Sequence, residues 1–157
     1  MTDKAVYKLL GATNTIYKGN DDSPGNRIYI RFADALLWKA EAYNETAQYP
    51  QAIAIINQIR ARARTTLTAG GTVPPVGTLP DRPASTDKTQ IKAWLIHERR
   101  VELGFESQRF NDLKRWGIAK QVLSALDKNF QDYNYLYPIP QSEIDRSGGS
   151  ITQNPGY

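Results

Sequence analysis

The segment His97–Gly117, which reads HERRVELGFESQRFNDLKRWG, decides the fold of this chain. It places charges of alternating sign inside a helical pattern that also carries large apolar residues. One stripe at helical spacing consists of Ile91, Trp94, Leu95, Glu98, Glu102 and Phe105. Glu98 and Glu102 therefore lie on a face that is otherwise apolar. Because an unpaired buried charge is very costly, we expect both carboxylates to form ion pairs.

The expected partners of these two carboxylates are arginines that follow them in the sequence. Arg109 and Arg115 flank Asp112 in the second half of the segment. Gly104 lies between the two halves and suits the C-terminal cap of a helix. The segment thus predicts a helix that ends at about Leu103, a turn at Gly104, and a second helix joined to the first by ion pairs.

The composition is that of an ordinary globular protein with room for a core. The chain has 157 residues, of which 40% are hydrophobic and 23% charged, and its formal net charge is +4. It contains no cysteine, which excludes disulfides, thiol catalysis and thiolate metal sites. No apolar run approaches the roughly 20 residues that a membrane-spanning helix needs. The first residues lack the pattern of a signal peptide.

Two helices are predicted upstream of the deciding segment. The first spans about residues 32–44, and its apolar face consists of Ala33, Leu36, Leu37, Ala40 and Tyr43. The second begins at about Tyr49, and its apolar residues at helical spacing are Ala52, Ile55, Ile56, Ile59 and Ala63. When Tyr43 is set at position eleven of a tetratricopeptide repeat, Ala40 falls at position eight and Ala52 at position twenty. Residues 27–64 therefore predict a tetratricopeptide-like helix hairpin, which other helices must cover.

The remaining segments complete a mainly α-helical chain that we expect to form a single domain. Residues 65–86 are rich in Gly, Pro, Thr and Ser and predict a long loop that is either functional or flexible. Residues 87–127 predict a second group of helices, the first of which is capped by Asp87. Residues 128–157 are aromatic and contain prolines, which predicts an extended tail packed on the helices. Residues 20–26 predict a turn or loop.

Three motifs, taken in their order along the chain, resemble the SusD/RagB family. The motifs are Ile30–Glu45, then Glu98–Gly117, and then Tyr137–Pro140 followed by Gln153–Tyr157. Their order and approximate spacing are similar to those in the family. The resemblance covers residues 27–64 and 86–157 well, and covers residues 1–26 and the loop between poorly.

The resemblance implies a function and a location. SusD/RagB proteins are outer-membrane nutrient-binding lipoproteins of Bacteroidetes-type bacteria, which capture oligosaccharides or other nutrients for a SusC-like TonB-dependent transporter. It therefore implies a surface-exposed, non-enzymatic binding protein of the outer membrane that needs no cofactor or metal. The architectural motif that carries over from the family consists of Glu98, Arg99, Glu102, Arg109, Asp112, Arg115 and Trp116.

The resemblance also implies a protein longer than this chain. Family members are several times longer and carry an export signal and a lipid-attached cysteine at the mature N-terminus. We expect the chain to be the C-terminal part of such a protein, whose lipid anchor lies outside this sequence. A short natural homologue without an anchor is the alternative. A different class of function, a tetratricopeptide-type protein–protein adaptor without a nutrient ligand, is the runner-up.

Neither metal binding nor catalysis is supported by the charged residues of the central motif. His97 and Glu98 are typical of a zinc protease helix, but position 101 is Val101 and the chain has no other histidine. Glu98 and Glu102 project from one side of one helix, whereas a glycosidase needs its carboxylates on opposite sides of the scissile bond. The sequence therefore predicts no catalytic residue and no metal ligand.

A cluster of arginines suggests nucleic-acid binding, but its spacing argues against this function. Arg60 and Arg64 share one face of the predicted helix, while Arg62 points nearly the opposite way. No basic stripe results, so we expect no nucleic-acid partner. A solvated helix end, where the three arginines face the negative end of the helix dipole, is the expected arrangement.

Aromatic residues are the remaining candidates for contact with a sugar. Trp94 and Trp116 lie on apolar faces of predicted helices, which favours positions in the core. Trp38 flanks the apolar stripe of its helix and is more open to contact with a partner. The candidates are Trp38, Tyr133, Tyr135 and Tyr137. The three tyrosines alternate along the chain, as in an extended segment with one row of rings outward.

Overall fold

The computed structural model describes residues 29–67 and 71–157, so the turn expected at residues 20–26 lies outside the described part. The described residues form helices and loops, with no strand among them, which confirms the expected mainly α-helical fold. None of these helices is long and apolar enough to cross a membrane. Two compact units divide the chain, one ending at Arg109 and the other comprising Phe110–Tyr157. The expectation of a single domain stays a prediction.

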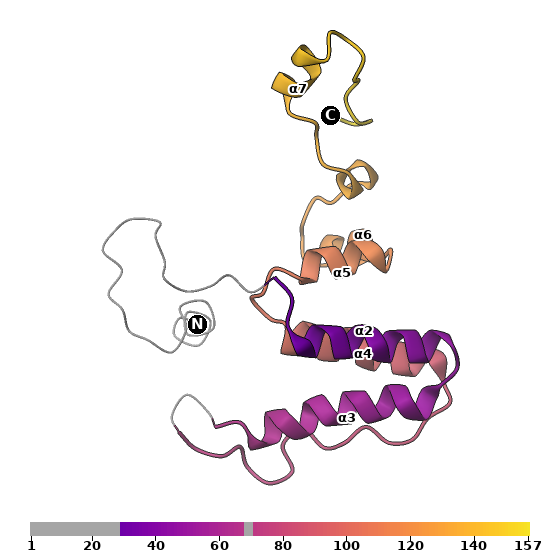
Figure 1. Cartoon of the computed structure of the whole chain (residues 1–157), viewed down its shortest axis with the longest axis vertical. Helices are drawn as coiled ribbons and strands as arrows, with labels where there is room; N and C mark the ends of the chain where they lie inside the picture. Colours follow the sequence, from indigo (N-terminus) through magenta and orange to yellow (C-terminus); the bar gives the residue numbers. More distant parts are fainter. Residues whose placement is uncertain (1–28, 68–70) are drawn as a thin grey trace. The chain divides into compact units, whose positions relative to one another are not determined.

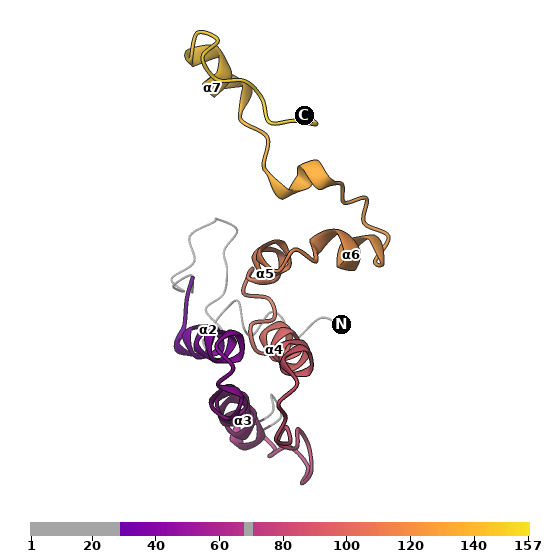
Figure 2. The same ribbon diagram turned by 90° about the vertical axis from the view of Figure 1, so that its right-hand side faces the viewer.

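Three helices make up the described part of the first unit, apart from the start of the next helix at its boundary. They are α2 (Phe32–Glu45), α3 (Tyr49–Thr65) and α4 (Lys88–Glu102). Figure 1 shows them side by side, and Figure 2 views them along their axes. α2 and α3 form the expected antiparallel hairpin, and α4 packs against both of its helices. The end of α4 therefore comes close to the beginning of α2.

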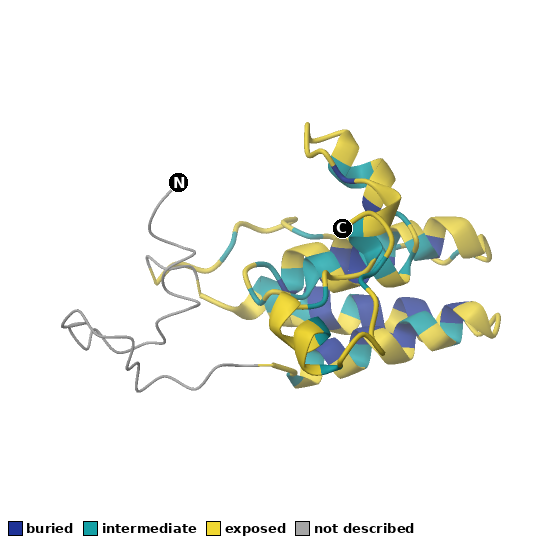
Figure 3. Ribbon diagram, turned by 90° about the horizontal axis from the view of Figure 1, so that it is seen from above, coloured by how far each residue is buried: buried dark blue, intermediate teal, exposed yellow. Residues whose placement is uncertain are grey.

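Aliphatic side chains from the three helices form the core of the first unit. In Figure 3 the buried residues recur along the helices, while the loops are mostly exposed. The core consists of Leu37, Ala40, Ala52, Ile53, Ile55, Ile56, Ile59, Ile91 and Leu95. Ala40 and Ala52 are completely buried, so small residues lie where α2 and α3 pack together. Each fully buried Leu or Ile contributes about 1.5–3 kcal/mol.

The last part of the loop at residues 65–86 is bound to α3. The side chain of Asn57 donates a hydrogen bond to the carbonyl of Arg82 at 3.0 Å and accepts one from its N–H at 2.8 Å. Two arginines of α3 donate to neighbouring carbonyls, Arg60 to Pro80 at 2.8 Å and Arg64 to Leu79 at 2.7 Å. These bonds satisfy backbone groups that have no partner in a helix or sheet. Residues 79–82 therefore form a strap on α3.

The turn after α4 differs from the sequence expectation. α4 ends at Glu102, but the left-handed backbone conformation falls on Phe105 (φ 66°) and Ser107 (φ 62°) and not on Gly104. Glu106 lies between these two residues and accepts hydrogen bonds from Arg31 at 2.7 and 3.0 Å. An ion pair to a distant arginine therefore holds this turn, where the sequence suggested a glycine cap.

Phe130 is at the centre of the second unit. The short helices here are α5 (Arg109–Arg115), which begins at the boundary, α6 (Ala119–Ser124), η1 (Asp132–Tyr135) and α7 (Gln141–Arg146). Phe130 packs with the buried Leu113 and Ala119. Its ring meets those of Phe110 and Tyr135 edge-on, with centroids 6.1 and 5.2 Å apart. The segment 128–157, expected to be extended, thus also contains two short helices.

The last residues of the chain fold back on residues 136–139. The Tyr157 hydroxyl donates to the carbonyl of Leu136 at 3.0 Å, and its ring meets that of Tyr133 edge-on. Gly156 has a φ of 95°, and a Cβ at this position would lie 2.6 Å from Tyr133 side-chain atoms. Glycine is therefore required here for both its backbone conformation and its lack of a side chain.

Ala40→Leu is expected to destabilise the protein by about 1–3 kcal/mol, because the larger side chain overpacks the contact between α2 and α3. Urea unfolding followed by circular dichroism measures the effect. Lys39→Leu is the matched control at the exposed neighbouring position, and it should change stability by less than about 0.5 kcal/mol. Equal effects of the two substitutions would contradict the close approach of the helices at Ala40.

Asn57→Ala is expected to release the strap and to cost about 1–3 kcal/mol, because it leaves the N–H and carbonyl of Arg82 without their partner. Hydrogen exchange at the amide of Arg82 should accelerate accordingly. Gln58→Ala, at the next and exposed position of the same helix, is the control. Unchanged exchange in Asn57→Ala would mean that the strap is held without this side chain.

Candidate functional site

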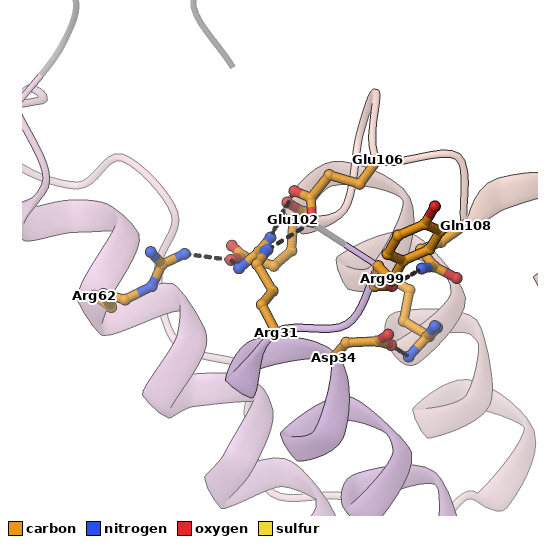
Figure 4. Close-up of polar contacts among 8 residues, drawn as sticks. Arg31, Asp34, Arg62, Arg99, Glu102, Glu106 and Gln108 are labelled. Atoms are coloured by element: carbon orange, nitrogen blue, oxygen red, sulfur yellow. Dashed lines mark hydrogen bonds and ion pairs between the residues drawn. The ribbon is translucent and has the colours of Figure 1, made fainter. Parts of the chain in front are cut away.

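A buried ion pair joins α2 to α4 and begins the network drawn in Figure 4. Asp34 and Arg99 are each 1% exposed, and their Oδ1 and Nη1 atoms lie 2.7 Å apart. The Arg99 guanidinium also lies 5.7 Å from the ring centroid of Trp38, within the range of a cation–π contact. Arg99, a member of the family motif, therefore contacts two residues of α2 that lie one turn apart.

Arg31 connects the beginning of α2 to the end of α4. It donates hydrogen bonds to the Glu102 carboxylate and to the Glu102 carbonyl, both at 2.6 Å, and to both carboxylate oxygens of Glu106. Burial lowers the pKa of Arg31, but the hydrogen bonds to Glu106 and Glu102 outweigh it and raise that pKa above its usual value. Arg62 of α3 contacts the same Glu102 carboxylate. Glu102 thus links all three helices.

Glu98 lies one turn earlier on α4 and has partners that differ from those expected. It pairs with Arg60 of α3 and with Arg82 of the strap, and not with the downstream Arg109 and Arg115. The expectation that Arg60 lies at a solvated helix end is wrong, because its side chain is 6% exposed. One signal was available in the sequence, since Arg60 follows the buried Ile56 by four residues and shares its face.

Of the remaining motif residues, Arg109 ends the first unit, and Asp112, Arg115 and Trp116 lie near the start of the second. Arg109 begins α5, and the buried Asp112 accepts a hydrogen bond from Nε of Arg115 at 2.9 Å. The guanidinium of Arg115 also lies 4.6 Å from the ring centroid of Trp116. Arg115 thus pairs within its own helix with a carboxylate three residues away.

The aromatic ligand candidates differ in exposure and lie in both units. Trp38 of the first unit is 41% exposed, while Tyr137 of the second is 65% exposed and has the Lys114 ammonium 4.6 Å from its ring centroid. Tyr133 and Tyr135 lie in η1, so the extended alternation expected for the three tyrosines is wrong. Tyr135 is partly buried and packs against the core beside Phe130. Tyr137 is therefore the most open of the candidates.

The charged residues of the site have a structural role. Among the residues that the structure describes, no three His, Asp or Glu side chains gather where they could hold a metal ion. The carboxylates of Glu98 and Glu102 accept from two arginines each. His97 is exposed on α4. The two carboxylates and their arginines join helix ends through charge-assisted hydrogen bonds. Such bonds are about twice as strong as neutral ones.

Glu98→Ala is expected to destabilise the protein by about 3–5 kcal/mol, because it leaves the buried Arg60 without its carboxylate. Glu102→Ala should cost less, about 1–3 kcal/mol, because Arg62 is 57% exposed and can be hydrated instead. Urea unfolding measures both.

The matched control for these substitutions is Asp81→Ala, which removes an exposed carboxylate that also pairs with an arginine of α3. It should cost less than about 1 kcal/mol. If Glu98→Ala costs no more than the control, Glu98 is not the buried partner of Arg60.

Sequence comparison identifies relatives that are much longer than this chain. The sequence model described as the SusD family matches residues 2–135 and 126–157, and so includes residues that the motifs covered poorly. The SusD-like proteins P2 and P38 of Formosa agariphila are 34% and 37% identical over 146 and 114 residues. These matches cover 87% and 73% of this chain, but 27% and 21% of the relatives. The chain thus spans about a quarter of their length.

Solved structures give the same result for the fold. A SusD homologue from Bacteroides thetaiotaomicron is 29% identical with a TM-score of 0.73, and the match covers 93% of this chain and 30% of that structure. A SusD superfamily protein from Bacteroides vulgatus is 31% identical with a TM-score of 0.68, covering 84% of this chain and 28% of that one. The central charged motif, the helix hairpin and these matches agree: the chain belongs to the SusD family.

Proposed function

We propose that this chain is part of a nutrient-binding protein on the outer surface of the outer membrane, which captures a glycan and passes it to a SusC-like TonB-dependent transporter. The observation that carries the proposal is the match to the SusD family along nearly the whole chain. The protein acts by binding alone and needs no cofactor. A lipid anchor outside this sequence attaches it to the membrane.

The chemistry of the described residues supports binding without catalysis. The central carboxylates are committed to arginines, as described above, and both project from one helix. A glycosidase needs two carboxylates that face the scissile bond from opposite sides. The alternative function, a tetratricopeptide-type adaptor without a nutrient ligand, has in its favour the helix hairpin of the first unit.

The aromatic residues of this chain make a small contribution to glycan binding in this proposal. Trp38, Tyr133 and Tyr137 offer exposed ring surface, whereas Tyr135 is partly buried and packs against the core of the second unit. A ring contact adds about 0.5–1.5 kcal/mol beyond the area that it buries. Three exposed rings supply too little free energy for tight binding, so most of the sugar contacts belong to the larger part of the protein.

This chain alone is expected to bind glycans with a Kd above about 1 mM, while the complete gene product binds at least one of them more tightly. Isothermal titration calorimetry of both proteins against the same panel of plant and host oligosaccharides measures the difference. A reducing-sugar assay on the same mixtures should detect no hydrolysis. Absence of glycan binding by the complete protein would favour the adaptor function, and release of reducing sugar would contradict a binding protein.

Micromolar glycan binding by this chain would contradict the proposal that most of the sugar contacts belong to the larger part of the protein. In that case Tyr137→Ala should weaken the binding, and Tyr29→Ala is the matched control, because Tyr29 is 69% exposed and is not a ligand candidate. Equal effects of the two substitutions would place the sugar elsewhere.

A further inference from the structure

Lys114 of α5 has two aromatic rings as neighbours in the second unit. Its Nζ atom lies 4.6 Å from the ring centroid of Tyr137 and 5.2 Å from that of Phe110, both within the range of a cation–π contact. Phe110 packs against the core of the unit, whereas Tyr137 is 65% exposed. The ammonium therefore contacts one ring that is fixed in the protein and one that is open.

The surroundings of Lys114 differ from those of other cations in this unit. Arg115, Lys120 and Arg146 each pair with a carboxylate. Among the residues that the structure describes, Lys114 has its two ring contacts and no ion pair. An ammonium has three N–H donors, and a ring face accepts them only weakly. Lys114 is thus a positioned cation whose donors are available to a stronger acceptor.

Side chains from the last residues of the sequence fix the backbone at Tyr137. Asn154 donates a hydrogen bond to the carbonyl of Tyr137 at 2.7 Å. Gln153 donates to the carbonyl of Ile139 at 2.9 Å and accepts from the N–H of the same residue at 2.8 Å. An exposed ring on a fixed backbone loses less conformational entropy when it meets a ligand, which favours binding. The tyrosine and the lysine beside it are therefore preorganised.

We propose that Lys114 and Tyr137 form a subsite for an anionic sugar residue, one that carries a carboxylate or a sulfate group. The apolar face of the sugar stacks on the Tyr137 ring, whose negative face attracts C–H groups. The anionic group accepts hydrogen bonds from the Lys114 ammonium. A hydroxyl of a neutral sugar can also accept from the ammonium, but it lacks the attraction between opposite charges. This inference rests on the glycan-binding function proposed above and names the class of sugar.

Two matched pairs of ligands test the subsite in the complete gene product. One pair is an oligogalacturonate and the same oligosaccharide with its carboxylates reduced to alcohols. The other pair is a sulfated galactan oligosaccharide before and after desulfation. Because each pair shares its sugar backbone, the ratio of its two Kd values isolates the effect of the anionic group. Comparison of the two ratios distinguishes a carboxylate site from a sulfate site. Isothermal titration calorimetry at low and at high ionic strength measures the Kd values.

In at least one pair, the acidic ligand is expected to bind at least about tenfold more tightly than its neutral counterpart at low ionic strength. This ratio should shrink as salt screens the charges. Lys114→Gln removes the charge and should reduce the ratio at least about fivefold, mainly by weakening the acidic ligand. Lys114→Arg should retain most of the ratio, because a guanidinium keeps the charge and can still contact the rings. Lys128→Gln, at an exposed lysine of the same unit, is the matched control and should leave the ratio unchanged.

Several outcomes would overturn the subsite. An unchanged ratio in Lys114→Gln, or an equal loss of affinity for both members of a pair, would leave Lys114 with a structural role alone. The same reduction in Lys128→Gln would assign the preference to the overall charge of the protein. A complete protein that binds only neutral glycans would overturn the subsite and leave the nutrient-binding function intact, whereas one that binds no glycan would overturn both.

Discussion

The burial of Arg99 between α2 and α4 is the constraint on which the first unit depends. An arginine that is 1% exposed requires a carboxylate beside it, and Asp34 supplies this from the first turn of α2. Removing one partner of such a pair costs more than the pair itself contributes, since the other charge stays buried. The register of α2 against α4 is therefore specified by charge as well as by packing. An apolar contact alone would tolerate a slip of the helices more easily.

The other ion pairs extend this constraint to α3 and to the strap. Glu98 connects α4 to Arg60 and Arg82, and Glu102 connects it to Arg31 and Arg62. Each carboxylate thus joins α4 to two other segments. Glu98, Arg99 and Glu102 of the family motif join α4 to its neighbouring segments, whereas Asp112 and Arg115 pair within α5. In the function proposed above, ligand contacts belong to aromatic residues and to parts of the protein beyond this chain.

The fold could be predicted in large part because its signals are local. Apolar periodicity placed α2, α3 and α4, and Asp87 caps α4 by accepting from the N–H groups of Thr89 and Gln90. The small residues Ala40 and Ala52 indicated a close hairpin, and both are buried. The end of α4 was harder to predict. There the left-handed conformation falls on Phe105, because the pair between Arg31 and Glu106 holds the turn from a position 75 residues away in the sequence.

The sequence by itself determined that Glu98 and Glu102 need partners, since two carboxylates on an apolar helix face must be neutralised. It did not determine which arginines meet them. That choice depends on the parallel packing of α3 beside α4, which brings Arg60 and Arg62 to the same end as the carboxylates. The same applies to the tyrosines. Their alternation is visible in the sequence, but the exposure of Tyr135 depends on its contact with Phe130, and that of Tyr133 on its contact with Tyr157. Helical periodicity is a property of neighbouring residues, whereas partners across helices are decided by tertiary packing.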